Sequence, residues 1–201
     1  MNPSAPHAVV LLAAGRSHRL GQPKQLLTQQ GETLLHRAAR LGHDTRPDRL
    51  VVVLDSEHGP MADALADIPH HAAINADPAS GLGGSLRVAA PHVAASAYVL
   101  VLVCDQPALS TEHLETLLRG ARTVSSGCAA TALDGLPGVP AVIPGHWFTT
   151  LSADLNDTGF RTRLRQLDPA RLFLLQDDGL RLDIDTPAAL ARARAEGLID
   201  A

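Results

Sequence analysis

The sequence predicts a single α/β domain over residues 1–201, in which a mostly parallel sheet lies between two layers of helices. Three observations support this prediction. Strand-like apolar runs alternate with helix-like segments, which is typical of repeated βαβ units. Two of these runs, 50–54 and 99–103, are continuously apolar, as expected for strands covered on both faces. Apolar residues form 45% of the 201-residue chain, which is enough for a full core.

The expected strands are short apolar runs bounded by turn residues. In chain order they cover 8–12, 50–54, 71–74, 98–103, 128–133, 139–143, 172–175 and 180–184. The alternation is clear up to residue 127 and looser beyond it, because glycines and prolines interrupt the region 135–140.

Helices are expected between these strands, at 33–42, 59–67, 85–95, 111–123, 157–167 and 187–196. Gly42 is expected to end the first helix. Ser110 and Glu112 are typical of a helix start and predict where the fourth begins. Either Asp185 or Thr186 is expected to cap the last helix, with Pro187 in its first turn.

Composition excludes several classes of protein. The net charge of −4 argues against nucleic acid or an anionic membrane as the main partner, since both favour a basic surface. The first residues lack the charged start and apolar core of a signal peptide, and the longest apolar run, 97–104, is too short to cross a bilayer. Two cysteines make no disulfide framework, and the ten histidines lack metal-ligand spacing. We therefore expect a cytoplasmic protein.

The segment 9–27 is the most informative part of the chain. An apolar strand runs into a turn at Gly15, and Arg16, Arg19 and Lys24 follow closely. Exposed backbone N–H groups and fixed cations together suit phosphate binding. The spacing matches neither the P-loop nor the dinucleotide-binding fingerprint. An ordinary strand–loop connection with solvated charges remains the alternative.

Acidic residues mark two further positions. Asp105 follows the most apolar strand, where a carboxylate is costly unless it binds a cation such as Mg²⁺; a helix-cap or turn role is the alternative. Asp183 and Asp185 lie two residues apart on an expected strand and would share one face. Two adjacent carboxylates repel each other unless a cation or strong donors intervene.

A glycine-rich segment, 75–86, leads into the third expected helix. Free N–H groups at a helix N-terminus bind anions. The alternative is a tight turn in which Ser85 is an ordinary N-cap.

The run from Leu12 to Lys24 resembles the signature of the MobA-like nucleotidyltransferases, L-A-A-G-x-S-x-R-(M/L)-G-x-P-K. The resemblance implies a Rossmann-like sheet of the nucleotide-diphospho-sugar transferase type, with a loop that wraps the triphosphate of an NTP. It implies a catalytic role for Arg19, Lys24 and Asp105. It also implies a nucleotide site formed by Leu12, Ala13, Ala14, Gly15, Arg16, Ser17, Arg19, Lys24, Asn75, Gly81 and Ser85.

The same resemblance extends to the acidic positions. Similar proteins carry D-x-P where this chain has Asp105, and D-I-D-T-P where it has Asp183 and Asp185. The resemblance implies that Asp105 binds a catalytic Mg²⁺ and that one of the other two completes the metal site. Similar proteins show G-D-x-G-A-R on the acceptor side, where this chain departs at Asn156 and Phe160.

Ala14, Pro23, the Gly81-Leu82 pair and the run Asp183-Ile184-Asp185 are similar to the cytidylyltransferase branch of the family, whereas the guanylyltransferase branch tends to have glycine at the position of Ala14. This resemblance implies transfer of CMP from CTP to a molybdopterin acceptor, release of pyrophosphate, and a molybdenum hydroxylase as client. Alternatives are another phosphorylated acceptor (a sugar phosphate, methylerythritol phosphate or phospholactate), a guanylyltransferase that uses GTP, or a non-catalytic accessory protein that only binds nucleotide.

Overall fold

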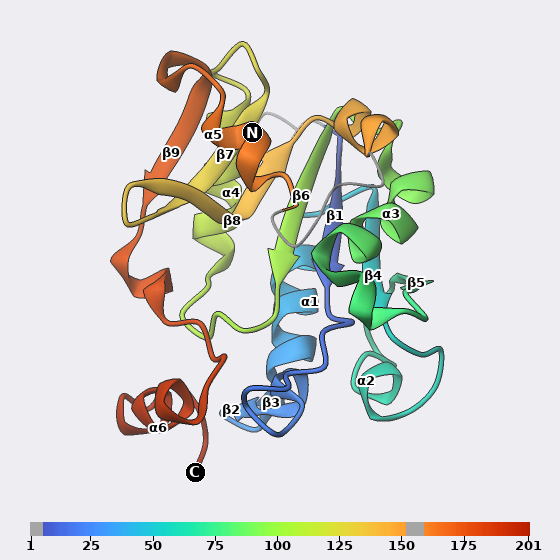
Figure 1. Ribbon diagram of the computed structural model, residues 1–201, viewed down its shortest axis with the longest axis vertical. Coiled ribbons are helices and arrows are strands. Elements are labelled where there is room, and N and C mark those ends of the chain that lie inside the picture. The colour runs from blue at the N-terminus through green and yellow to red at the C-terminus, as the bar shows by residue number, and fades with distance from the viewer. Residues whose placement is uncertain (1–5, 152–158) are drawn as a thin grey trace.

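The computed structural model describes residues 6–151 and 159–201, and its seven-stranded sheet has the order β5-β4-β1-β6-β8-β7-β9 (Figure 1). The strands are β1 His7–Leu12, β4 Arg49–Leu54, β5 His71–Ile74, β6 Tyr98–Val103, β7 Cys128–Leu133, β8 Leu136–Ile143 and β9 Leu172–Gln176. Strand β8 is antiparallel to both neighbours, and the other pairs are parallel. The predicted mostly parallel sheet is therefore confirmed.

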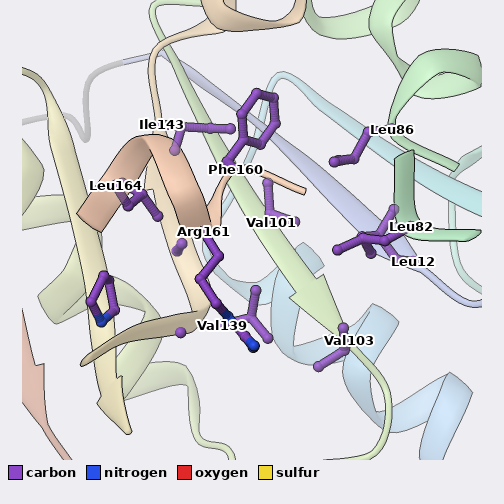
Figure 2. A pocket seen from close by; sticks show the side chains of 13 residues that line it. Leu12, Leu82, Leu86, Val101, Val103, Val139, Ile143, Phe160, Arg161 and Leu164 are labelled. Carbon is purple, nitrogen blue, oxygen red and sulfur yellow. The ribbon is translucent and has the colours of Figure 1, made fainter. Parts of the chain in front are cut away.

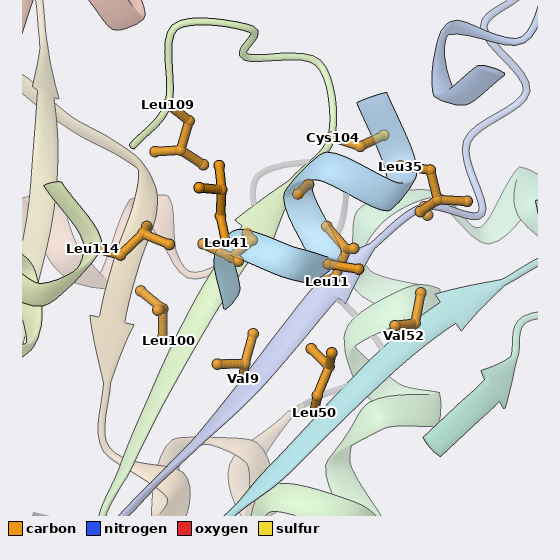
Figure 3. Packing of buried hydrophobic residues seen from close by; sticks show 14 of the residues in the cluster. Val9, Leu11, Leu35, Leu41, Leu50, Val52, Leu100, Cys104, Leu109 and Leu114 are labelled. Carbon is orange, nitrogen blue, oxygen red and sulfur yellow. The ribbon is translucent and has the colours of Figure 1, made fainter. Parts of the chain in front are cut away.

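Helices cover both faces of this sheet. α1 (Leu34–Asp44) and α4 (Thr111–Ala121) pack on one face, and α3 (Gly81–Val93) and α5 (Arg161–Arg165) pack on the other. Side chains of a strand alternate between faces, so β1 contributes to both cores. Figure 3 shows Val9 and Leu11 of β1 beneath α1, close to Leu35 and Leu41. The predicted three-layer arrangement is confirmed.

Smaller elements complete the chain. They are the helices α2 (Pro60–Asp63) and α6 (Pro187–Ala195), the hairpin strands β2 (Thr28–Gln29) and β3 (Glu32–Thr33), and 3₁₀ turns at Lys24–Leu26, Pro78–Ser80, Gly145–Thr150, Pro169–Arg171 and Asp178–Arg181. In the described part of the chain, no helix has the length and apolar character needed to cross a bilayer.

The connections reverse direction between β1 and β6. From β1 the chain continues to β4 and β5 on one side, and then returns through α3 to β6 on the other side of β1. Loops that leave two such strands at their carboxyl ends diverge and open a crevice, which is where α/β sheets bind ligands. The phosphate-loop candidate follows β1 and Asp105 follows β6, so both lie at this crevice.

The first two helices do not end where the sequence predicts. Gly42 does not end α1, which continues to Asp44; the helix instead packs the α-carbon of Gly42 tightly against Val9 and Leu102. The second helix stops at Asp63 because the chain turns there to bury Leu65 and Ile68. Ser110 is confirmed as the N-cap of α4, because its side chain accepts a hydrogen bond from the His113 N–H.

The third helix begins earlier than predicted. It includes the glycine-rich segment from Gly81, so Ser85 lies inside the helix and is not its N-cap. Gly84 is required there, since a Cβ would come within 1.7 Å of Ser80 Oγ. Of the predicted helix 157–167, residues 157 and 158 lie outside the described residues, and the described helix starts at Arg161.

The predicted strand 180–184 is absent. Residues Asp178–Arg181 form a 3₁₀ turn, and the following segment crosses back over the carboxyl ends of the central strands. There the Ile184 N–H donates to the Asp105 carbonyl at 3.2 Å, and the Asp185 N–H donates to the Asp183 carbonyl at 3.0 Å. Leu180, Leu182 and Ile184 alternate with polar residues as in a strand, but the cause is different. Leu180 is buried in the core on the α1 face of the sheet, and Ile184 is buried in a separate cluster with Leu20 and Leu27.

Candidate functional site

The loop after β1 is held in shape by Ser17. This residue has a left-handed backbone, with φ of 49°, and its carbonyl accepts hydrogen bonds from the N–H groups of Leu20 and Gly21. Its side-chain oxygen accepts a third from the Lys24 N–H at 3.2 Å. Gly21 also has a positive φ, of 75°. The loop therefore closes into a compact turn that presents Arg19 and Lys24 at its two ends.

Gln25 stabilises the same loop through hydrogen bonds, a role that the sequence alone did not predict. Its side chain is buried, and Nε2 donates to the carbonyl of Ala13 at 2.8 Å and to that of Gly15 at 2.6 Å. Its Oε1 accepts from the Ser17 hydroxyl at 3.3 Å. In the sequence, Gln25 lies between the cation Lys24 and the apolar pair Leu26 and Leu27. A polar residue beside an apolar pair was the one feature that could have indicated a buried side chain.

Two carboxylates hold Lys24. Its ammonium donates to Asp105 Oδ2 in a short contact, and to Asp185 Oδ1 at 2.6 Å. Arg19 donates to the other oxygen of Asp185 at 2.8 Å. The side chains of Lys24 and Asp105 are only 17% and 11% exposed, whereas that of Arg19 is 74% exposed. Three separate chain segments thus meet at one charged cluster, formed by Arg19, Lys24, Asp105 and Asp185.

This cluster perturbs the acidity of its members. Burial works to lower the pKa of Lys24, but Asp105 and Asp185 outweigh it and raise that pKa above its usual value, so the ammonium stays charged. Burial opposes ionisation of Asp185, yet hydrogen bonds and charge from Lys24 lower its pKa. Asp183 is exposed as a residue, but surrounding atoms partly desolvate its carboxyl group. This desolvation and the negative charge of Asp105 raise the pKa of Asp183 to about 6.

Packing at the C-terminus places Asp185. The neighbouring Ile184 is fully buried among Leu20, Leu27 and Leu34, and α6 packs against the same cluster. Thr186 caps α6 by accepting a hydrogen bond from the Ala189 N–H. Of the two capping candidates, Thr186 is confirmed, and the side chain of Asp185 points to the cations instead. Asp183 and Asp185 lie on a turn, so the prediction that they share one face of a strand is wrong.

The glycine-rich segment contributes a second wall. Asn75 follows β5, and its Nδ2 donates to Ser85 Oγ at 3.1 Å, so these two predicted residues do meet. Asn75 Oδ1 accepts from the Asp77 N–H and thereby fixes the turn before α3. Both side chains are buried, and Gly81 lies one helical turn before Ser85.

Two pockets flank Lys24. The inner pocket is lined by Leu12, Ala14, Gly15, Lys24, Gln25, Gly81, Leu82, Ser85, Val103, Cys104 and Asp105. The outer pocket is lined by Gly15, Ser17, His18, Arg19, Leu20, Lys24, Ile184 and Asp185. Most predicted site residues line one or both pockets, while Ala13 is buried behind the loop and Asn75 behind Ser85. Arg16 is exposed and lines neither pocket.

The residues present fit a divalent cation held by two carboxylates. Oδ1 of Asp105 is buried and accepts no hydrogen bond from the described residues, which suits an oxygen that ligates a metal. Asp105 and Asp185 already hold one cation, the ammonium of Lys24, between them. No group of three or more His, Cys, Asp or Glu side chains in the described chain is arranged to hold a metal, so a third protein ligand is not in place.

The fold and the site together define a nucleotide-binding α/β protein with a cationic loop opposite a carboxylate pair. The family model of the MobA-like NTP transferase domain matches residues 9–171, and the chain belongs to this family of nucleotidyltransferases. The expected family membership is therefore confirmed.

The chain is also similar to individual proteins, and the solved structure among them agrees with its fold. The chain is 31% identical over 192 residues to the nicotine blue oxidoreductase of Paenarthrobacter nicotinovorans, covering 91% of this chain and 94% of that protein. It is 28% identical over 137 residues to a probable molybdenum cofactor guanylyltransferase of Opitutus terrae, covering 68% and 66%. A nucleotidyl transferase structure from Methanothermobacter superimposes with a TM-score of 0.79 at 22% identity, covering 96% and 98%.

Replacing Gln25 by Glu should disorder the loop after β1. A carboxylate cannot donate to the carbonyls of Ala13 and Gly15, so two buried hydrogen bonds are lost and like partial charges face each other. We expect a loss of about 2–4 kcal/mol in the free energy of unfolding, and weaker nucleotide binding. Chemical denaturation and nucleotide titration measure these effects. Gln22→Glu, an exposed neighbour, should change neither; equal behaviour of the two variants would contradict this role for Gln25.

Proposed function

We propose that this chain is a Mg²⁺-dependent cytidylyltransferase that transfers CMP from CTP to a molybdopterin-type acceptor and releases pyrophosphate. The observation that carries the proposal is the cation-binding pair of Asp105 and Asp185 beside the loop of Arg19 and Lys24, at the crevice between β1 and β6. One solved structure of similar fold, Rv0371C of Mycobacterium tuberculosis, is a complex with manganese, which supports a divalent metal here. One relative is named an oxidoreductase, but residues 12–24 lack the fingerprint with which Rossmann folds bind a nicotinamide dinucleotide. This difference argues against hydride transfer by this chain.

In the proposed reaction, a terminal phosphate oxygen of the acceptor forms a bond to the α-phosphorus of CTP. The bond from that phosphorus to the oxygen that bridges to the β-phosphate breaks, and pyrophosphate leaves. No protein nucleophile is needed, so the chain contributes position and charge. A bound Mg²⁺ would neutralise phosphate charge. Asp105 and Asp185 would hold it.

The two cations of the loop would act on the phosphates. Lys24 lies between the inner and outer pockets, so its ammonium can contact a chain of phosphates that runs from one pocket to the other. Arg19 lines the outer pocket, where its planar fork suits the leaving pyrophosphate. For both contacts to form, Arg19 and Lys24 must give up their ion pairs with Asp185 and bind phosphate oxygens instead. A metal at the carboxylates would then replace the positive charge that Lys24 supplies.

The choice of CTP rests on Ala14. Its methyl group lies in the inner pocket, where the guanylyltransferase branch has glycine, and added volume there disfavours a purine. The guanylyltransferase relative supports GTP as the second candidate. A molybdenum hydroxylase would be the client that receives the completed cofactor.

Titration of the protein with CTP, GTP, ATP and UTP in the presence of Mg²⁺ tests this choice. We expect CTP to bind about tenfold tighter than GTP or more, because one methyl group in a pocket changes affinity by roughly 1–3 kcal/mol. Ala14→Gly should reduce this preference and leave the affinity for CTP nearly unchanged. Equal or tighter binding of GTP by the native protein would overturn the assignment to CTP and leave the nucleotidyltransferase assignment in place.

A further inference from the structure

Strand β9 forms one outer edge of the seven-stranded sheet (Figure 1). It pairs in parallel with β7 on one side, and no described strand pairs with it on the other. We call this second side the free edge of β9. A sheet edge with unpaired backbone groups is a template for pairing with another chain unless the sequence protects it.

The sequence of β9 carries none of the usual protection. Natural edge strands are blunted by charged side chains, proline or bulges. β9 instead reads Leu-Phe-Leu-Leu-Gln, and a run of four apolar residues is typical of a strand that has neighbours on both sides and cover on both faces. Phe173, Leu174 and Leu175 are each only partly buried. Phe173 and Leu175 pack toward the core on the α4 face, and Leu174 packs toward the core on the α3 face.

The rest of the sheet differs from β9. At the opposite edge, β5 is a shorter strand that follows Pro69 and begins with His71. On the α3 face, apolar side chains of the inner strands β1, β6 and β8 line a pocket together with Leu82 and Leu86 of α3 and with Phe160 (Figure 2). The side chains of these inner strands therefore already have apolar neighbours within the chain, whereas β9 has room for a further strand beside it.

Opposite charges flank β9. Arg171 comes directly before the strand, is exposed, and forms no ion pair with a described residue. Asp177 comes directly after the strand, and its side chain is 37% exposed. One oxygen of its carboxylate binds His113 at 3.0 Å and the other accepts from the Gly179 N–H at 3.0 Å. A carboxylate has about four accepting positions, so Asp177 can still bind an arginine.

These charges match a second copy of the same strand. Two copies that pair antiparallel about a two-fold axis align all five residues of both strands when Leu174 lies opposite Leu174 of the partner subunit. The same register places Arg171 opposite Asp177 of the partner subunit, at both ends of the pair. Parallel pairing would instead bring Arg171 against Arg171 of the partner subunit, and like charges directly opposite each other are destabilising.

We propose that the free edge of β9 is a homodimer interface, at which β9 pairs antiparallel with β9 of a second copy of this chain about a two-fold axis at Leu174. Backbone hydrogen bonds between the two strands join the sheets of the two copies into one. A two-fold axis normal to the sheet keeps each face on its own side, so Phe173 lies opposite Leu175 of the partner subunit and the partly exposed apolar side chains cover each other.

Sedimentation velocity of the full chain over a series of concentrations tests for the dimer. Leu174→Lys would place two ammonium groups opposite each other at the axis, and in a monomer its long side chain can still reach solvent. We expect this variant to raise the dissociation constant of the dimer by about tenfold or more. Arg171→Glu should do the same, because it sets a glutamate against Asp177 of the partner subunit at both ends.

A matched control separates this effect from a general change of charge. Arg49→Glu makes the same charge change at an exposed position at the start of β4, in the other half of the sheet, and should leave the dissociation constant within about twofold. Far-UV circular dichroism checks that each variant is folded. If Leu174→Lys does not fold, the exposed Arg171→Glu gives the same comparison.

Cysteine variants test the register directly. Opposite residues of an antiparallel pair have α-carbons about 4.5–5.5 Å apart, which is within reach of a disulfide. Mild oxidation should therefore link two copies of Leu174→Cys. Two copies of Leu175→Cys would be offset by two residues along the strands, with α-carbons about 8 Å apart, too far for a disulfide. The native residues Cys104 and Cys128 are buried and should not form a link between copies.

The outcomes distinguish this interface from others and from the proposed function. We expect a native dimer, its loss in Leu174→Lys and Arg171→Glu, and a covalent dimer with Leu174→Cys. A monomer at all concentrations up to about 100 µM, a dimer that both charged variants leave intact, or equal linking of Leu174→Cys and Leu175→Cys would overturn the inference. Strands β8 and β7 lie between β6 and β9, so CTP titrations should be the same in all these variants whichever result is found.

Discussion

Replacing Asp105 by Asn will reduce Mg²⁺-dependent pyrophosphate release by about a hundredfold to a thousandfold, the size expected when a preorganised charge contact in a transition state is lost. The carboxylate lies at the crevice between β1 and β6; its Oδ2 contacts Lys24, and its buried Oδ1 has no hydrogen-bond partner in the part of the chain that the structure describes. Asparagine has the same shape but no charge, and the hydrogen bond from the Ile184 N–H to the backbone carbonyl of residue 105 remains. The fold should therefore persist while metal binding is lost.

The measurement compares pyrophosphate release and unfolding for Asp105→Asn, Asp185→Asn and a matched control. Asp134→Asn is suitable, because Asp134 is 83% exposed and asparagine tolerates its positive φ of 52°. We expect the first two variants to be impaired and the control to match the native protein. A folded Asp105→Asn variant with near-normal turnover would remove the metal role of this residue.

Replacing Lys24 by Met will lower both stability and nucleotide use. The sequence places Lys24 in a loop, where substitutions usually change the free energy of unfolding by only about 0.5 kcal/mol. The structure instead buries its ammonium between Asp105 and Asp185, so its removal leaves two carboxylates without a cation. We expect a loss of about 1–3 kcal/mol in stability and a tenfold to hundredfold lower kcat/KM.

Thermal unfolding with and without Mg²⁺ gives this prediction a second readout. If a metal binds the same carboxylates, Mg²⁺ should raise the Tm of Lys24→Met by more than that of the native protein. Arg19→Met is the matched control: Arg19 is 74% exposed and, among the described residues, forms an ion pair only with Asp185, so its loss should cost about 1 kcal/mol or less. Equal stability of the native protein and Lys24→Met, with no response to Mg²⁺, would contradict the charged cluster as described.

Local chemistry explains which features the sequence predicts correctly. The apolar runs of β1 and β6 are recognisable from their own residues, and Asp105 follows the second after a single residue, Cys104. The loop after β1 carries its cations within a few residues, so its character is visible without the fold. Ser110 and Thr186 cap their helices through contacts only three residues long. In each case the deciding interaction lies within the same short segment.

Features set by distant contacts were not predictable in this way. The segment 182–185 has a strand-like pattern, but its backbone bonds to Asp105 and its side chains pack against the loop around Leu20 and Leu27. Gln25 acts through the carbonyls of Ala13 and Gly15, which only the folded loop brings to it. The positions of segment 182–185 and of the Gln25 side chain depend on which parts of the chain come together in the folded protein. The residues next to them in the sequence do not reveal these contacts.

Transfer of CMP to a molybdopterin-type acceptor is the activity that we propose for this site. The most direct measurement incubates the native protein with Mg²⁺, α-phosphate-labelled CTP and one acceptor at a time: molybdopterin, N-acetylglucosamine 1-phosphate or methylerythritol phosphate. We expect labelled product and an equal amount of pyrophosphate with molybdopterin alone, and neither after chelation of Mg²⁺ by EDTA. Transfer to a polyol phosphate in preference to molybdopterin, or no transfer to any of the three, would contradict it.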